Sequence, residues 1–544
     1  MSLFRRLVKK IEVPDEQTDP NETHQWSNFD LAPTPKHERI WGSTTFAAFW
    51  CAHAAGAGSW TAGSSVIALG LDPVVAYHIG FPVFSRTAYG MWGSYMAVGM
   101  RAVGVNAWYA SRCVWVGICA IWPQWRTLPN ALPASASITS TQAASFFMFM
   151  LVQQGMTFFH ARDLKYFYHV KSITVFITFH GILIWFMVKT GGARISEFVS
   201  TPMSHDSYLW LAARSFNAGL GAASSLTVNQ GDMTRYATKP RDAIWSTMIM
   251  YPLASALPCL YGILVAAAAK NMTGKAVWNM WDALDLILRQ YDDNRGARFL
   301  VAMAAFFIAL SYLGVNLATN CLPFGSDLSA LFPRWFTIRR GQFLCSLLGV
   351  AIVPWKLLTS AAKFITFLSG YGYWLAPIAG ILFADYWLIS KGNIDISQIY
   401  TSNPLGRYWY ARGWNWRAVV TTILSLLPCL PGFAQQIASG PLPGLSKIGT
   451  NLFYVSFVLT YTLAITLYLS LSYLFPRKYI AEHDLKSQRF EQLADEGDAR
   501  ERDDEILALG EDGSLGGGAA MDKTESKSEV EGIAYVEPAQ VELR

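Results

Sequence analysis

The feature that most constrains this chain is a series of apolar runs, each about as long as a helix that crosses a lipid bilayer. A hydrocarbon core about 30 Å thick requires about 20 helical residues at a rise of about 1.5 Å per residue. Eleven such runs, separated by polar connections, extend over residues 43–70, 92–121, 143–161, 172–190, 208–230, 242–269, 298–324, 342–359, 362–389, 417–436 and 451–475. The sequence therefore predicts an all-α, polytopic membrane protein.

Composition argues against a soluble protein. Hydrophobic residues make up 52% of the 544 residues and charged residues only 15%, whereas a soluble domain carries about 25% charged residues. The net charge of +5 comes from basic residues in the connections, so it does not indicate a nucleic-acid partner. The seven cysteines lie mostly inside apolar runs without CxxC spacing, which is typical of small buried side chains. We therefore expect no metal, cofactor or disulfide framework.

The two ends of the chain differ in composition from its middle. Residues 1–40 are basic and polar and contain no signal-peptide core, which predicts a disordered cytosolic arm. Residues 41–476 form the predicted transmembrane transporter domain. Residues 477–544 are rich in Glu, Asp, Lys and Gly and are predicted to be a disordered acidic tail in the cytosol. Lys523 and Lys527 in this tail could receive ubiquitin, or the tail could be solvated without a partner.

Basic residues in the connections predict how the chain crosses the membrane. Lys and Arg concentrate in cytosolic loops, and here they occupy alternate connections, represented by Lys171, Arg235, Arg334 and Arg407. The basic N-terminal arm and the residues after Arg477 place both ends of the chain in the cytosol by the same rule. Eleven spans cannot place both ends on one side, so the predicted count and the predicted orientation disagree by one helix.

Three of the apolar runs contain clusters of Gly and small residues. The clusters lie at residues 54–58, 217–221 and 369–372. One interpretation is discontinuous helices around a central solute site, because unwound backbone survives at membrane depth only where it is buried or lines a cavity. The other is close packing of continuous helices, which small residues permit. The sequence leaves both open.

Several blocks, in the right order, resemble the nucleobase–cation symporter-1 family in its fungal uracil, allantoin and uridine permease branch. The blocks are Tyr77–Arg86, Ile121–Pro123, Asn229–Tyr236, Asp327–Pro333, Leu375–Gly380 and Phe383–Trp387. The resemblance implies a LeuT-like fold of two inverted five-helix repeats with two further helices, which makes twelve spans. It also implies a plasma-membrane permease that imports a nucleobase or hydantoin-like solute by alternating access.

The resemblance assigns a set of candidate solute-binding residues. Trp108 is implied to stack on the planar base, with simple packing as the alternative. Asn320 is implied to pair with the donor and acceptor edge of the base, with hydrogen bonding between helices as the alternative. Asn316 lies one turn before Asn320 and could support it.

Further candidates lie on two other predicted helices. Ala222 and Ala223 follow the cluster at 217–221 and are implied to present bare backbone to the solute, or else to allow close packing. Tyr371 corresponds to a gate residue.

The coupling ion is predicted to be a proton. Sodium-coupled relatives use two hydroxyl side chains whose positions here hold Gly314 and Val315, and neither offers a side-chain oxygen to a hard cation. The candidate proton-coupling residues are His53, Asp232 and Asp327. For the two aspartates, capping of helix ends near the cytosolic face is an alternative role.

The chain departs from the family at two places. A whole helix is missing after Leu71–Pro73, which would account for the odd number of spans. About six residues are missing after Tyr109, so that Arg112 stands where the family has a Gln that reads the solute. An erroneous exon prediction, a splice form and a diverged protein are the three explanations, and the first two predict a product that does not transport.

Other functional classes are less well supported by the residues. No HExxH, G-x-x-x-x-G-K-[ST] or nucleophile motif indicates a membrane enzyme. A transporter of the same fold for amino acids or thiamine-like solutes, and a sensing relative that binds without transport, remain alternatives.

Overall fold

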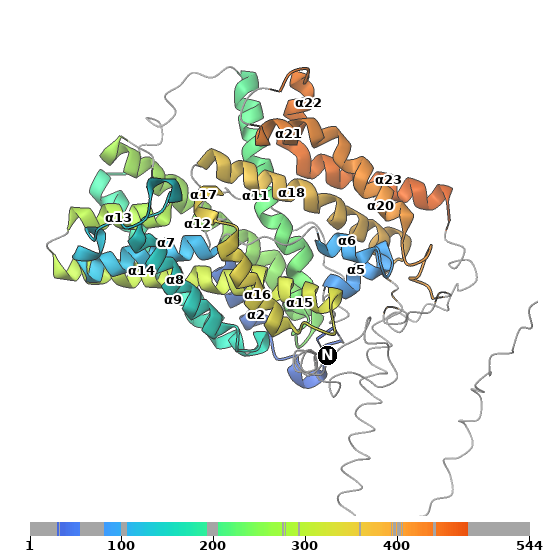
Figure 1. Cartoon of the computed structure of the whole chain (residues 1–544), viewed down its shortest axis with the longest axis horizontal. Helices are drawn as coiled ribbons and strands as arrows, with labels where there is room; N and C mark the ends of the chain where they lie inside the picture. The colour runs from blue at the N-terminus through green and yellow to red at the C-terminus, as the bar shows by residue number, and fades with distance from the viewer. Residues whose placement is uncertain are drawn as a thin grey trace, which may run out of the picture. The chain divides into compact units, whose positions relative to one another are not determined.

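The computed structural model describes the chain between residues 30 and 476, with gaps (Figure 1). The gaps are residues 32, 55–80, 100–105, 193–204, 275–276, 278, 292–293, 358–360, 393, 395–398, 400–403, 405 and 439–441. Three parts of the sequence analysis therefore lie outside the described residues. They are the position after Leu71 where a helix is missing, residues 55–58 of the first small-residue cluster, and the tail with Lys523 and Lys527.

The described residues fold into helices and contain no strand. In chain order the helices are α2 (Ser43–Ala54), α5 (Phe81–Tyr89), α6 (Ser94–Gly99), α7 (Asn106–Ile121), α8 (Ser140–Met156), α9 (Lys165–Thr190), α11 (His205–Thr234), α12 (Pro240–Thr273), α13 (Met280–Gln290), α14 (Arg295–Asn316), α15 (Leu322–Leu331), α16 (Ile338–Ala351), α17 (Pro354–Leu357), α18 (Ala361–Phe383), α20 (Trp416–Leu426), α21 (Leu430–Ile437), α22 (Lys447–Asn451) and α23 (Ser456–Leu474). Each of the eleven predicted runs overlaps at least one of these helices.

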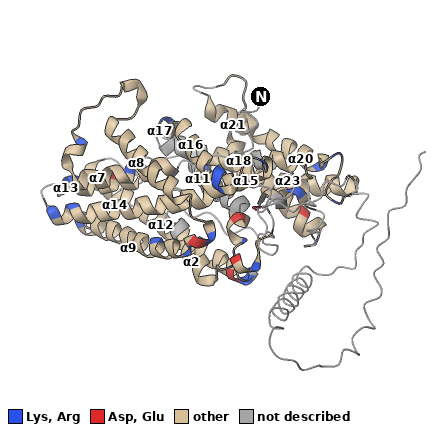
Figure 2. Ribbon diagram, turned by 60° about the horizontal axis from the view of Figure 1, so that its bottom comes forward, with Lys and Arg blue, Asp and Glu red and all other residues tan. Residues whose placement is uncertain are grey.

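Six stretches of the described chain are long and apolar enough to cross a membrane. They are Ala161–Thr190, Arg241–Thr273, Arg295–Leu331, Ser369–Ile389, Trp416–Ile437 and Lys447–Leu474. The helix α7 is apolar but shorter, with 16 residues, or about 24 Å of helix. Figure 2 shows that most of the ribbon carries no charge, and that acidic and basic residues gather beside α2.

The interruption predicted at residues 217–221 and 369–372 is wrong, because α11 and α18 continue through these positions as regular helix. The two glycine clusters instead face each other. A Cβ placed on Gly372 would lie 2.7 Å from the Gly221 Cα, so the helix backbones touch. The packing interpretation is confirmed here, since only glycine lets two helices approach so closely.

The irregular turns of the long helices occur at positions that the sequence pattern did not predict. Two π-turns, η6 (Leu317–Cys321) and η7 (Ala384–Ile389), interrupt the Arg295–Leu331 and Ser369–Ile389 stretches. A π-turn inserts an extra residue into a helix and often marks a functional position.

The prediction of a disordered arm over residues 1–40 is wrong for its last part. The Asp30 carboxylate accepts a hydrogen bond from the Ile338 amide at 2.8 Å, and Arg235 Nε donates to Thr34 Oγ1 at 2.7 Å. The Trp41 amide donates to the Tyr236 carbonyl at 2.9 Å. This segment is therefore ordered against the ends of α11 and α16, because its polar groups meet partners that lie far away in the sequence.

Candidate functional site

A chain of polar side chains lies where α8, η6 and α16 meet. Asn320 Nδ2 donates to Asn316 Oδ1, Asn316 Nδ2 to Gln153 Oε1, and Gln153 Nε2 to Ser346 Oγ, each at 2.7 Å. Ser346 Oγ donates to the Gln342 carbonyl at 3.2 Å. Asn316, Gln153 and Ser346 are buried, and this series of hydrogen bonds links α8, the end of α14 and α16. Buried polar groups of this kind are stable when each finds a partner.

The predicted residues Asn316 and Asn320 thus lie together, and η6 sets their position. Asn320 belongs to this π-turn, and the Cys345 thiol donates to its backbone carbonyl at 3.7 Å. Asn320 is half-buried. Among the described residues no donor reaches its Oδ1, while its Nδ2 group is held by Asn316. The acceptor side of this carboxamide is therefore available to a ligand.

The sequence did not single out Gln153, although its amide connects Asn316 to Ser346. It lies on α8 and is 1% exposed, with both ends of its amide used. A glutamine inside a predicted span was the available signal, because polar side chains in spanning helices usually serve helix contacts or a site.

Trp108 lies on α7 and is buried among other aromatic rings. Its ring centre lies 6.1 Å from that of Phe146 on α8 and 5.8 Å from that of Trp355 on α17. These contacts make Trp108 a packing residue in this structure.

The register between α7 and α14 separates Trp108 from Asn320. The two helices run antiparallel: Arg298 Nη2 donates to the Ile121 carbonyl at 2.9 Å, and the Tyr109 and Tyr312 ring centres lie 5.9 Å apart. Trp108 is therefore level with Tyr312. Asn320 follows eight residues later, about 12 Å further along the axis. The structure does not bring the two predicted solute contacts together.

The remaining predicted solute residues lie on α11 and α18. Ala222 and Ala223 continue the regular turns of α11, so their backbone is not unwound. Their side chains lie outside the described residues. Tyr371 is half-buried on α18, next to the Gly372 contact with α11.

The three predicted proton-coupling residues lie on three different helices, α2, α11 and α15. His53 lies in the last turn of α2, and its side chain lies outside the described residues. Asp232 and Asp327 are buried, at 2% and 4% exposure, near the ends of α11 and α15.

A buried lysine, Lys171, lies beside Gly314, which stands where sodium-coupled relatives have a hydroxyl side chain. A Cβ on Gly314 would lie 3.0 Å from Lys171 Nζ and 2.7 Å from Phe167 Cε1, so the Lys171 side chain covers the glycine. Lys171 is 1% exposed and lies inside α9, within a stretch of membrane length. Its placement in a cytosolic connection was therefore wrong. Only the tertiary structure shows that it reaches Gly314.

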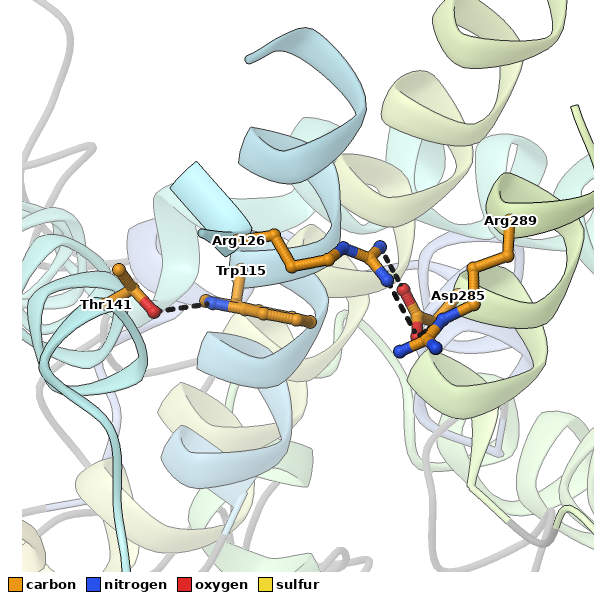
Figure 3. Close-up of polar contacts among 5 residues, drawn as sticks. All are labelled: Trp115, Arg126, Thr141, Asp285 and Arg289. Atoms are coloured by element: carbon orange, nitrogen blue, oxygen red, sulfur yellow. Dashed lines mark hydrogen bonds and ion pairs between the residues drawn. The ribbon is translucent and has the colours of Figure 1, made fainter. Parts of the chain in front are cut away.

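A second polar group lies beside the C-terminal half of α7 (Figure 3). Arg126 forms an ion pair with Asp285 of α13, and Arg289 Nε donates to the same carboxylate at 2.9 Å. Trp115 Nε1 donates to Thr141 Oγ1 at 3.1 Å. The Arg126 guanidinium lies 5.6 Å from the centre of the Trp115 ring. Arg112 is one turn before Trp115 on α7.

Buried polar side chains thus link helices, one of them of membrane-spanning length, around an accessible amide. Residues 73–456 match the family model for permeases of cytosine/purines, uracil, thiamine and allantoin. The chain belongs to this family, the nucleobase–cation symporters, as the resemblance predicted.

Two fungal relatives illustrate the similarity. A permease of Schizosaccharomyces pombe is 32% identical over 464 residues, which cover 80% of this chain and 78% of the relative. The uridine permease of Saccharomyces cerevisiae is 30% identical over 535 residues, which cover 88% and 82%.

A solved structure confirms the predicted fold class. A nucleobase-cation-symport-1 family transporter, in a closed conformation with bromovinylhydantoin bound, matches 86% of this chain and 99% of its own with a TM-score of 0.61. The sequence identity is 19%, so this likeness establishes the LeuT-like transporter fold alone.

Proposed function

We propose that this chain imports a nucleobase or related heterocycle, of the uracil, allantoin or uridine type, by proton-coupled alternating access across the plasma membrane. The observation that carries the proposal is the Asn320 carboxamide, which is fixed in a π-turn with its acceptor side open. Both ends of the chain lie in the cytosol under this proposal if the helix missing after Leu71–Pro73 is restored, which gives twelve spans.

The chemistry of Asn320 suits a lactam edge. A carboxamide carries a donor and an acceptor in one plane, and the ring N–H and C=O of uracil or a hydantoin present the complementary pair. The Asn316 and Gln153 amides hold Asn320 in one orientation. This support reduces the rotamer freedom that Asn320 would lose when solute binds.

Proton coupling is favoured by the contact between Lys171 and Gly314. An ammonium group beside this position repels a metal cation, and the glycine offers no side-chain oxygen. An ionisable residue buried at membrane depth is costly and usually functional. Lys171 therefore joins His53, Asp232 and Asp327 as a candidate for the group that carries the proton.

The test is uptake of radiolabelled uracil, allantoin and uridine by yeast cells that lack their own permeases. We expect one of these solutes to accumulate, faster at acidic external pH, and a protonophore to abolish accumulation. Excess thiamine and amino acids serve as competitors for the same-fold alternatives. Uptake that rises with Na⁺ and ignores the pH gradient would exclude the proton.

A second candidate is a product that folds but does not transport, and the register of α7 supports it. Trp108 lies about 12 Å from the level of Asn320, and six further residues after Tyr109 would move it by about 9 Å towards that level. Inserting six helix-forming residues at this point should restore uptake to an inactive chain. A chain that transports without the insertion excludes this candidate.

A further inference from the structure

We propose that Cys321 of η6 and Cys345 of α16 form a two-sulfur binding site for Cu⁺. The proposal concerns a metal ion and does not depend on which solute the chain carries. Their spacing in the sequence shows no metal motif and predicts small buried side chains. The pair arises because two segments that are distant in the sequence pack against each other.

The two cysteines lie where η6 and α16 contact each other crosswise. The Cys345 thiol donates to the Asn320 carbonyl at 3.7 Å, and Cys321 Sγ lies 3.9 Å from Ser346 Oγ. A side-chain hydrogen bond also links the Cys321 and Cys345 thiols. Both are free cysteines rather than a disulfide, which is the form that the reducing cytosol maintains. These contacts place the two sulfur atoms side by side.

The contact between the thiols is close enough for one ion to join them. A bond from a thiolate sulfur to a metal ion such as Zn²⁺ is about 2.3 Å long. Two sulfurs on opposite sides of one ion therefore lie at most about 4.6 Å apart. Thiols in hydrogen-bond contact are already near this separation. The ion takes the place of the two thiol protons, so it needs no preformed cavity.

The number of ligands selects the ion. Zn²⁺ takes four ligands in structural sites, and within the described residues no group of three or more His, Cys, Asp or Glu side chains gathers to hold a metal. Hard cations such as Mg²⁺ prefer oxygen ligands. Cu⁺ prefers soft sulfur ligands and is stable with two of them in a line. Among the metal ions that cells use, two sulfurs without a third ligand therefore favour Cu⁺.

The surrounding amides stabilise the charge that binding creates. Two S–H bonds break, two Cu–S bonds form and two protons leave, so the occupied site carries a net negative charge. Gln153 Nε2 donates to Cys321 Sγ at 3.7 Å, and Asn316 Nδ2 donates to the same sulfur at 3.9 Å. Each amide nitrogen has two hydrogens, and the other one serves Ser346 or Gln153. Hydrogen bonds to the charged form of a group favour that form.

The pair is accessible through Cys345. The Cys321 side chain is 1% exposed, whereas Cys345 is half-buried beside the half-buried Asn320. The ion therefore meets Cys345 first and reaches Cys321 through the contact between the thiols. A bound ion would tie η6 to α16 and restrain the π-turn that carries Asn320.

The test is a titration of the purified full-length protein in detergent with Cu⁺ alone, without oxygen, in competition with a coloured Cu⁺ chelator. We expect the wild type to bind Cu⁺ and to bind Zn²⁺ at least about 100-fold more weakly. Cys321→Ser and Cys345→Ser should each weaken Cu⁺ binding by at least about 100-fold, because one of the two bonds is lost. The matched control is Cys429→Ser, which removes a buried thiol that donates to the Leu452 carbonyl at 3.5 Å and should keep the affinity.

Thermal unfolding provides a second measurement. Midpoints without metal establish that each variant is folded, and an alanine replaces any serine that prevents folding. Adding Cu⁺ should raise the midpoint of the wild type and of Cys429→Ser, and leave those of Cys321→Ser and Cys345→Ser unchanged. A wild type that binds no Cu⁺ or prefers Zn²⁺, or cysteine-pair variants that bind Cu⁺ as tightly as the control, overturns the proposal. Both measurements report binding, so they are independent of whether the chain transports a solute.

Discussion

The amides around Asn320 and the buried cations beside α14 differ in how many of their hydrogen-bonding groups find a partner. Around Asn320, each amide donates to the next, and the chain ends on the hydroxyl of Ser346. On α7, Arg112 lies between two tryptophan rings without a hydrogen-bond acceptor for Nη1 among the described residues. Lys171 resembles Arg112, since its ammonium is buried against Gly314 and the nearby ring of Tyr168.

This difference distinguishes side chains that hold the helices together from side chains that change state during transport. Neutral amides that satisfy one another can remain in one arrangement throughout a transport cycle, because no partner is missing. A buried cation without an acceptor gains most from a change of state, such as loss of a proton or arrival of an anion. The comparison therefore favours a rigid role for the Asn320 chain and supports the proposal that Lys171 changes its protonation state.

The largest effect on uptake is expected at Asn320, whose amide is held by Asn316 and has its acceptor side open. Asn320→Ala removes the carboxamide that we propose pairs with the solute, and it should lower uptake by about 100-fold, equivalent to about 2.8 kcal/mol. Initial rates measured at equal surface expression check this. Asn451→Ala, at the end of α22, is the matched control and should transport normally. Uptake within a few-fold of wild type in Asn320→Ala would place the solute elsewhere.

The next effect concerns coupling. Lys171→Met removes the buried charge and should abolish accumulation driven by the pH gradient, while exchange of labelled for unlabelled solute continues. The same change in Lys165, at the start of the same helix, is the control. Uptake at acidic and neutral pH distinguishes the two variants. A Lys171→Met protein that still accumulates solute against a gradient would assign the proton to another residue.

A smaller effect, on stability, is expected at Gln153. Gln153→Leu leaves the Asn316 amide and the Ser346 hydroxyl without their partner, which should destabilise the protein by about 1–3 kcal/mol. Thermal unfolding in detergent measures this as a lower midpoint. Gln154→Leu, the next residue, should have little effect, because its Oε1 has no partner in the described structure and its Nε2 loses only an exposed 3.5 Å hydrogen bond to the Phe343 carbonyl. Equal midpoints for both variants would mean that the amide chain adds no rigidity.

The last prediction compares two glycines of the spanning helices, and its Gly181 variant has the smallest expected effect. Gly372→Ala places a Cβ 2.7 Å from the Gly221 Cα and should destabilise the protein by about 1–3 kcal/mol through overpacking. Gly181→Ala meets nothing within 4 Å and should stabilise α9 by about 0.5–1 kcal/mol. Unfolding midpoints that move in the same direction would contradict the contact between α11 and α18.

The helical membrane fold and the family could be predicted from sequence because they depend on local quantities. Each of the eleven apolar runs overlaps a helix in the described structure, since a run of apolar residues in lipid must satisfy its own backbone. Asn316 and Asn320 could be paired from their spacing alone, because residues four apart share one face of a helix.

Contacts between distant segments could not be predicted in this way. Nothing in the sequence around Gly221 distinguishes a broken helix from one that packs against Gly372, because both require small residues. The reach of Lys171 to Gly314, the order of residues 30–40 and the register that separates Trp108 from Asn320 likewise depend on which helices become neighbours.

Sequence by itself determined the class of this protein and the pairing of Asn316 with Asn320 in the candidate site. The tertiary structure alone decided that Gln153 fixes Asn320, that Lys171 fills the space beside Gly314, and that Arg112 has no hydrogen-bond acceptor for Nη1 among the described residues. The physical reason is that apolar length and helical spacing act within one segment. The partner of a buried charge is chosen by packing between segments.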